Sequence, residues 1–220
     1  MDAERAPAKS AAEFLPIVGA YSLVARCRAD MAAASEFSRL RALAEDGRYL
    51  VRDGVRLALE GIAADRGDEF AARLADWTNG YLAAAVAIEA LASRSWLDAV
   101  KSPDDLFLRL DEAFSLVEDA PRADQRSQGY RTLLKALSEA PARILDRFPQ
   151  ATLAWLETRA ATEHVELRGA LSALIDRARG RGHGAGKFER LEQMLAASAP
   201  PRRDPKTYVG PTRKRGARRR

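Results

Sequence analysis

The sequence predicts an all-α protein, specifically a right-handed α–α superhelix of the HEAT or armadillo type, from three observations. Ala and Leu, which favour helices, occupy 70 of the 220 positions, whereas the β-branched Val and Ile occupy only 14. Apolar residues recur at steps of three and four, and short segments of Gly, Pro, Asp or Asn interrupt them. Similar helix-forming segments also recur along the chain, as expected for a repeat protein.

The periodic segments predict about ten consecutive helices, and no strand-like alternation lies between them. The predicted helices span residues 11–28, 31–46, 48–64, 68–78, 80–93, 104–119, 126–140, 142–147 continuing after Pro149 to about 160, 164–179 and 186–198.

Turn-forming residues mark the ends of these helices. Pro103 suits a first helical turn, where no N–H is needed, and Asp104 and Asp105 then face the positive end of the helix dipole. Pro141 predicts a break, because proline removes a helical hydrogen bond. The predicted joints are Asp46-Gly47, Arg66-Gly67-Asp68, Asn79-Gly80, Lys101-Ser102-Pro103, Ala120-Pro121 and Glu139-Ala140-Pro141.

Short joints fold neighbouring helices into antiparallel hairpins, which are buried either in a bundle or in a stacked solenoid. Residues 50–59 resemble residues 166–175, at an offset of 116 that equals three units of about 39 residues, close to the HEAT period. Residues 82–91 fit the same frame, and residues 130–134 fit it loosely. A basic residue recurs after an apolar one at the start of these second helices, which favours the solenoid.

Several segments resemble bacterial HEAT-repeat proteins over roughly residues 36–178. The resemblance implies a solenoid whose second helices line a concave surface, and it implies no particular activity. We therefore divide the chain into an N-terminal capping helix region (1–30), HEAT-like helical repeats (31–199) and a basic tail (200–220). The segments that carry the resemblance are Leu40-Arg41-Ala42-Leu43-Ala44-Glu45-Asp46, Tyr49 to Leu59, Arg73-Leu74-Ala75-Asp76-Trp77, Ala154-Trp155-Leu156 and Val165-Glu166-Leu167-Arg168.

One segment, Ser95-Trp96-Leu97-Asp98-Ala99-Val100-Lys101, is similar to part of the HEAT-repeat alkylpurine DNA glycosylases. That family grips damaged duplex DNA in its concave face. Leu97 stands where the family has a second Trp, and Lys101 stands where it has the functional Asp, so the catalytic role does not carry over. A glycosylase-like activity on alkylated DNA, with Trp96, Asp98 and Trp155 in the cleft, is an alternative hypothesis.

Positive charge is concentrated in the basic tail. Nine of the 36 Lys and Arg residues lie there beside one acid, Asp204, so the tail carries +8 and residues 1–199 carry −3. Four prolines, two glycines and almost no apolar residues predict a disordered arm. Such an arm attracts nucleic-acid phosphates, although it could also bind another acidic partner or act only as a solubilising tail. Its cations are Arg202, Arg203, Lys206, Arg213, Lys214, Arg215, Arg218, Arg219 and Arg220.

A second set of cations is predicted to form a phosphate-binding row on the concave face. The alternative is that the recurring Arg is structural and bonds an acid or a helix terminus of the neighbouring repeat. Trp77, Trp96 and Trp155 could stack on bases, but their helical spacing among Leu and Ala favours packing between hairpins. The candidate row is Arg52, Arg56, Arg131, Lys135 and Arg168.

No catalytic residue, cofactor or metal site is expected. Cys27 is the only cysteine, which excludes an intramolecular disulfide framework. His164 and His183 are the only histidines, so the chain has too few Cys and His residues for a Cys/His zinc site. Residues 177–187 do not match a phosphate-binding loop, because Arg181 stands at the first Gly position and Phe188 replaces the Ser/Thr. We expect a basic loop there, with His183 exposed and unpartnered.

The sequence thus predicts a non-catalytic helical-repeat scaffold that binds a macromolecular partner, plausibly nucleic acid through the basic tail. A purely protein-binding adaptor is a further alternative. The apolar run at residues 14–25 follows acidic residues and is too short to span a bilayer, so we expect neither a secretory signal nor a membrane span. A reducing cytoplasm is the expected location.

Overall fold

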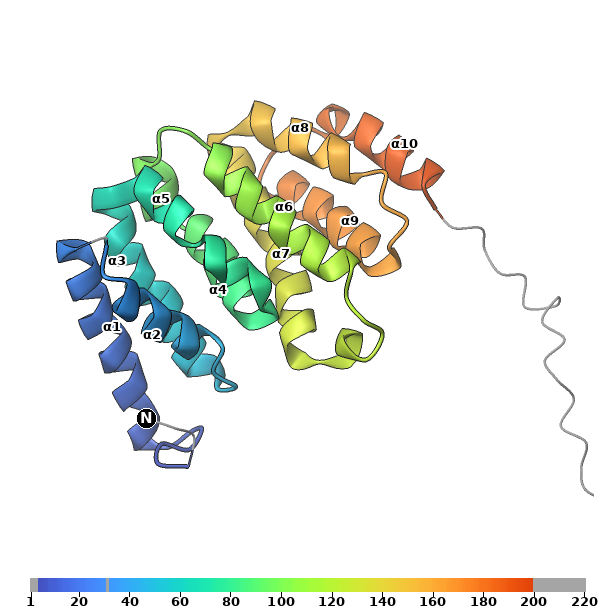
Figure 1. Ribbon diagram of the computed structural model, residues 1–220. Coiled ribbons are helices and arrows are strands. Elements are labelled where there is room, and N and C mark those ends of the chain that lie inside the picture. The colour runs from blue at the N-terminus through green and yellow to red at the C-terminus, as the bar shows by residue number, and fades with distance from the viewer. Residues whose placement is uncertain (1–3, 31, 200–220) are drawn as a thin grey trace, which may run out of the picture.

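The computed structural model describes residues 4–30 and 32–199, which fold entirely into helices and loops (Figure 1). The predicted all-α class is therefore confirmed for these residues, while the basic tail and its nine cations lie outside them. The α-helices are α1 (Phe14–Ala29), α2 (Ala34–Ala44), α3 (Tyr49–Arg73), α4 (Tyr81–Leu91), α5 (Arg94–Ala99), α6 (Asp104–Glu118), α7 (Gln128–Arg147), α8 (Pro149–Arg159), α9 (Val165–Gly180) and α10 (Glu189–Ala197). The 3₁₀ helices are η1 (Ala11–Glu13), η2 (Ala75–Asn79), η3 (Asp124–Arg126) and η4 (Ala185–Lys187).

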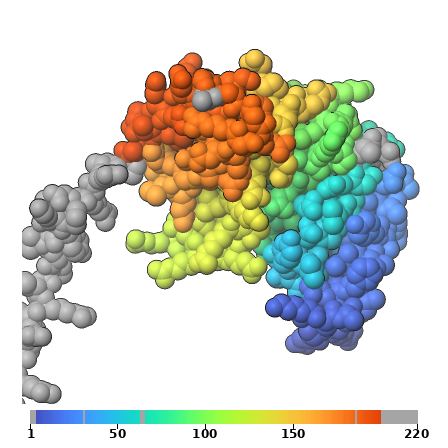
Figure 2. Space-filling view, turned by 180° about the vertical axis from the view of Figure 1, so that it is seen from behind, coloured from blue at the N-terminus to red at the C-terminus, as the bar shows by residue number. Residues whose placement is uncertain are grey.

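The helices form two layers. In the first layer α1, α3, α4, α7 and α9 pack side by side in that order. The second layer consists of α2, η2, α6, α8 and α10, and Figure 1 shows α2, α6 and α8 in front of the first layer. Figure 2 shows the opposite face, on which the first layer runs from blue α1 to orange α9. The short helix α5 packs on α3, α4 and α7.

The core lies between the layers and is continuous from α1 to α10. In α4 every residue from Ala83 to Ile88 is buried, which is the pattern of a helix surrounded by others. Tyr130 of α7 connects three helices of the first layer. Its ring meets Tyr81 of α4 edge-on at 5.8 Å, and its hydroxyl donates to Glu166 of α9.

Helix α6 begins at the predicted Asp104, and side-chain caps mark the starts of α7 and α9. Helix α6 begins at Asp104, where the Ser102 hydroxyl accepts a hydrogen bond from the Asp104 N–H at 3.3 Å. Ser127 caps α7 by accepting from the Tyr130 N–H at 3.1 Å. The imidazole of His164 caps α9 in the same way, so this histidine has a structural role.

The predicted joint at Arg66-Gly67-Asp68 is a kink inside one helix. Helix α3 runs from Tyr49 to Arg73, and only Arg66 has non-helical angles, with φ −136° and ψ 35°. The Gly67 carbonyl accepts a hydrogen bond from Trp96 Nε1 of α5 at 2.9 Å, and a Cβ on Gly67 would lie 3.1 Å from the Ala99 backbone. Packing against α5 therefore bends the helix at this point without ending it.

The predicted break at Pro141 is wrong. Helix α7 continues from Gln128 to Arg147 with a buried Pro141 in its interior. An interior proline costs about 3 kcal/mol because it removes one hydrogen bond. Leu137 on one side and Ile144 and Leu145 on the other are all buried in the same core, and their burial outweighs that cost.

The sequence analysis missed α5, because six residues are too few to show a helical period. The Ser93 hydroxyl, which accepts from the Trp96 N–H at 3.4 Å, was the available start signal. None of the helices in the described part of the chain combines the length and the apolar character that crossing a membrane requires.

Candidate nucleic-acid interface

Helix α7 carries a charged residue at every fourth position of its exposed side. Because four residues complete about one helical turn, these side chains share one face. Four of them are cations, interrupted once by Glu139, and we call these four the α7 row. The α7 row consists of Arg131, Lys135, Arg143 and Arg147.

The N-terminal half of the α7 row borders a groove of about 550 Å³ between α3, α4 and α7, which we call the wide groove. Figure 2 shows a hollow on this face between the yellow-green start of α7 and the blue and cyan segments of α1 and α3. Buried Ala85 and Val86 of α4 form its apolar floor. Its remaining lining residues are Tyr49, Arg52, Asp53, Glu89, Arg126, Gln128, Arg131, Thr132 and Lys135.

Three cations on the α7 side of the wide groove are available to a ligand. The side chains of Arg126, Arg131 and Lys135 are exposed, and none of these side chains forms a hydrogen bond or ion pair with another described residue. The groove also contains two acids, but Asp53 is already held by Arg56, whose Nε donates to it at 3.0 Å. The groove therefore offers its positive charge along one wall.

The C-terminal half of the α7 row borders a second groove of about 320 Å³, the narrow groove. Arg143 Nε donates to the carbonyl of Ala92, just after α4, at 3.1 Å. Arg94 is 3.5 Å from Asp98, and both are exposed. The lining residues are Ala92, Arg94, Leu97, Asp98, Arg143, Asp146, Arg147 and Arg181, which include four cations and two acids.

His183 was expected to have no partner, but it forms a hydrogen bond with Asp146. Its Nε2 lies 2.9 Å from Oδ1 of Asp146, and Arg181 donates to Oδ2 of the same carboxylate. Burial of Asp146 on its own raises its pKa, but the hydrogen bonds from Arg181 and His183 outweigh that effect and lower the pKa below its usual range. The segment after α9 is thereby attached to the end of α7.

Glu89 of α4 makes the floor between the two grooves acidic. Burial raises the pKa of Glu89, while the positive charges of Arg56 and Arg143 oppose part of that rise. Glu139, which interrupts the α7 row, lies 3.6 Å from Arg177 of α9. The exposed cations thus lie at the two ends of the face, with acidic groups between them.

The five predicted concave-face cations divide into two groups. Arg131 and Lys135 are the exposed members of the wide groove described above. Arg52 is buried and donates to the Asp46 carbonyl at 2.7 Å, and Arg56 is held by Asp53 and Glu60. Arg168 donates to the Leu195 carbonyl and to the Ser198 hydroxyl at the end of α10. All three therefore have structural contacts, but only Arg168 bonds the end of another helix, as the alternative hypothesis states. Arg52 bonds the turn before its own helix, and Arg56 bonds acids of its own helix.

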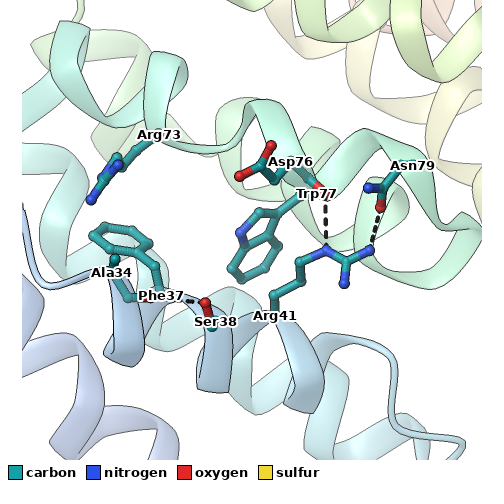
Figure 3. A pocket seen from close by; sticks show the side chains of 8 residues that line it. All are labelled: Ala34, Phe37, Ser38, Arg41, Arg73, Asp76, Trp77 and Asn79. Atoms are coloured by element: carbon teal, nitrogen blue, oxygen red, sulfur yellow. Dashed lines mark hydrogen bonds between the residues drawn. The ribbon is translucent and has the colours of Figure 1, made fainter.

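Trp77 lies beside a separate pocket of about 290 Å³ between α2 and η2 (Figure 3). Arg41 Nε donates to the Asp76 carbonyl at 2.9 Å, and Arg73 lies 5.4 Å from the centre of the Phe37 ring. Trp77 itself is only 2% exposed, so its faces are not available for stacking on a base. This pocket lies where α2 packs on η2 and on the end of α3.

The residues of the glycosylase hypothesis do not line a common cleft. Trp96 is completely buried and bonds Gly67, whereas Asp98 is exposed in the narrow groove. Trp155 of α8 donates to Asp111 Oδ1 at 2.6 Å and packs edge-on against Phe114 of α6 at 6.1 Å. All three tryptophans therefore contribute to packing.

Sequence reasoning missed the second half of the α7 row, Arg143 and Arg147, together with Tyr49 and Arg126 of the wide groove. The four-residue spacing from Arg131 to Arg147 was visible in the sequence. The predicted break at Pro141 divided that spacing between two helices and concealed it. Arg94 and Arg181 join the narrow groove only through tertiary packing, for which the sequence carries no local signal.

Comparison of the chain with protein-family models, curated proteins and solved structures found no match. Within residues 4–30 and 32–199, no three His, Cys, Asp or Glu side chains are grouped so that they could hold a metal ion. The two grooves beside the α7 row are each lined by four cations and two acids.

Proposed function

We propose that this chain is a non-catalytic helical scaffold that binds nucleic acid through phosphate contacts along the α7 row. The observation that carries the proposal is that the side chains of Arg126, Arg131 and Lys135 lie exposed on one wall of a groove without a hydrogen bond or ion pair to any described residue. Residues 1–199 are net acidic, with 27 basic and 30 acidic residues, so a surplus of cations on one face is a local feature. Exposed Lys and Arg bind phosphates and release counterions.

The scaffold is a HEAT- or armadillo-like superhelix in this proposal. Its support is the alternation of the chain between the layers, with α2, α6 and α8 in the second layer and α3, α7 and α9 in the first. The first-layer helices are the ones in which the sequence repeats its basic residue. In repeat proteins of this kind, one layer lines an extended binding surface.

The basic tail supplies additional cations in the same proposal. It follows α10 directly and carries nine Lys and Arg residues against one acid. A cationic arm increases affinity for any phosphate backbone, while the folded face sets how the backbone lies.

The experiment is a salt titration of binding to a fluorescent 20-base-pair DNA duplex, measured by anisotropy. The variant Arg131→Gln with Lys135→Gln removes two phosphate contacts, so the slope of log affinity against log salt falls in magnitude by about 1.8. A chain ending at Ala199 loses the contribution of the tail. If five to eight cations of the tail contact phosphates, the magnitude of the slope falls by about 4.5 to 7.

The matched control is the double variant Arg39→Gln with Arg190→Gln. It removes two positive charges, as the groove variant does, but from the second layer. Helices α2 and α10 carry these residues, outside both grooves. We expect the control to retain the slope of the native chain to within about 0.5. Equal slopes for the groove variant and the control would contradict a role for the α7 row. Salt-insensitive binding of the full chain to polyglutamate, with no binding to the duplex, would favour the protein-binding adaptor.

A further inference from the structure

The wide groove has a chemistry that the narrow groove lacks. Tyr49 begins α3 on the wall opposite α7 and is 65% exposed. Ala85 and Val86, which are both buried, form the apolar part of the groove floor. The narrow groove contains four arginines and no aromatic residue. The two grooves therefore suit different parts of a polyanionic ligand.

We infer that the wide groove binds an unstacked nucleotide of a single strand, with its base on Tyr49 and its flanking phosphates on Arg131 and Lys135. This inference rests on the proposed function and specifies the class of nucleic acid. Aromatic side chains bind bases of single strands by stacking, and basic grooves follow the backbone. In a duplex the bases are stacked on one another, so their faces are not available to a tyrosine.

The distribution of charge in the wide groove supports this orientation. The free cations Arg126 and Arg131 are on the α7 side, and the acidic Glu89 is on the floor. A phosphate is repelled from the floor and attracted to the α7 wall. An uncharged base is not repelled, and it meets the apolar surfaces of Val86 and Tyr49. The strand therefore runs along α7 with a base directed toward α3.

The volume of the wide groove is consistent with a ligand of this size. It measures about 550 Å³, within the range of about 300 to 1,000 Å³ that is common for small-molecule sites. Gln128 and Thr132 also line it. Their polar groups lie on the same wall as the cations, where the sugar and phosphates would be.

The test compares Tyr49→Ala with the native full-length chain on four probes: dT15, rU15, a 15-base-pair DNA duplex and a 15-unit abasic phosphate backbone. Loss of stacking weakens binding of a single strand by about 5- to 150-fold, which corresponds to about 1 to 3 kcal/mol. We expect this loss for dT15, rU15 or both, and the affected probe identifies the strand chemistry. Affinities for the duplex and the abasic backbone change less than about twofold, because no phosphate contact is lost.

Two further variants separate stacking from structural damage. Tyr49→Phe keeps the ring and retains affinity for the single strand. Tyr21→Ala removes a tyrosine that is 49% exposed on α1, outside the groove, and leaves binding to all probes unchanged. The slope of log affinity against log salt also stays the same for Tyr49→Ala, because tyrosine carries no positive charge.

Failure of the inference can be distinguished from failure of the proposed function. If Tyr49→Ala leaves both single strands unaffected, or weakens the duplex and the abasic backbone equally, the stacking site is overturned while phosphate binding stands. If the native chain binds none of the four probes at low salt, both proposals are overturned.

Discussion

At the residue scale, arginines of similar local sequence have different roles. Arg52 and Arg168 both follow an apolar residue near the start of a helix, and both donate to backbone carbonyls, Arg52 to Asp46 in the turn before α3 and Arg168 to Leu195 of α10. Arg131 has the same local pattern but lies exposed in the wide groove. The difference arises from which neighbouring helix end lies within reach, so a single residue's sequence context cannot decide it.

Asp46, in the turn between α2 and α3, gives a pH-dependent prediction. Its carboxylate accepts from the Arg48 backbone N–H and from Arg48 Nε, each at 2.8 Å. Hydrogen bonding from Arg48 lowers the pKa of Asp46, so its stabilising effect is present above the unfolded pKa of about 3.9 and is lost as pH falls through the lower folded value. Asp46→Asn reduces the free energy of unfolding by about 1 to 3 kcal/mol at pH 7.

Urea denaturation at pH 7 and below pH 4 measures this effect. The difference between the native chain and Asp46→Asn shrinks as the pH falls below the unfolded pKa, and it is lost below the lower folded pKa, where the carboxylate is protonated in both states. The control is Glu163→Gln, which changes an exposed carboxylate and shifts stability by less than about 0.5 kcal/mol. A destabilisation by Asp46→Asn that is the same at both pH values would contradict the ionic contribution.

At the scale of the element, α3 shows how one helix accommodates a close neighbour. Gly54 lies where α1 approaches, and a Cβ there would be 2.8 Å from Cγ2 and 3.2 Å from Cβ of Ile17. Gly61, seven residues later on the same helix, has only Val24 near it, at 3.8 Å. The two glycines are equivalent in helix propensity but differ in the space beside them.

We therefore predict opposite effects for the same substitution. Gly54→Ala lowers the free energy of unfolding by about 1 to 3 kcal/mol, because the branched Ile17 side chain cannot move away without displacing α1. Gly61→Ala raises it by about 0.5 to 1 kcal/mol, because alanine favours the helix and ordinary van der Waals contact remains. Chemical denaturation of the two variants measures both values, and a stabilised Gly54→Ala would show that α1 is loosely attached.

At the scale of the whole molecule, the two layers share one core. Tyr130 contacts both Tyr81 and Glu166, and α6 packs on α3, α4, α7 and α9. Trp77 lies in the N-terminal half of the core and Trp155 in the C-terminal half. Because no polar boundary divides the buried residues, the described part of the chain should unfold as one cooperative unit.

Urea unfolding of Trp77→Phe and Trp155→Phe tests this cooperativity. Trp155→Phe leaves Trp77 and Trp96, which report on the N-terminal half, whereas Trp77→Phe keeps Trp155 as the reporter of the C-terminal half beside Trp96. Circular dichroism at 222 nm reports on all helices. We expect the fluorescence and circular dichroism midpoints to coincide within each variant, even though both variants are less stable than the native chain. Separate midpoints would indicate that the two halves of the described chain unfold one after another.

The sequence by itself determined the helical class and most helix positions, because composition and apolar period are local properties. It also placed Arg131 and Lys135 among the candidate binding residues. It also predicted an interruption at Arg66-Gly67-Asp68, where α3 bends. Only the tertiary structure decided that α7 continues through Pro141 and that Arg143 and Arg147 extend the α7 row. The physical reason is that burial of side chains against distant helices outweighs the local cost of a proline. The proline is visible in the sequence, whereas the burial energy depends on tertiary contacts.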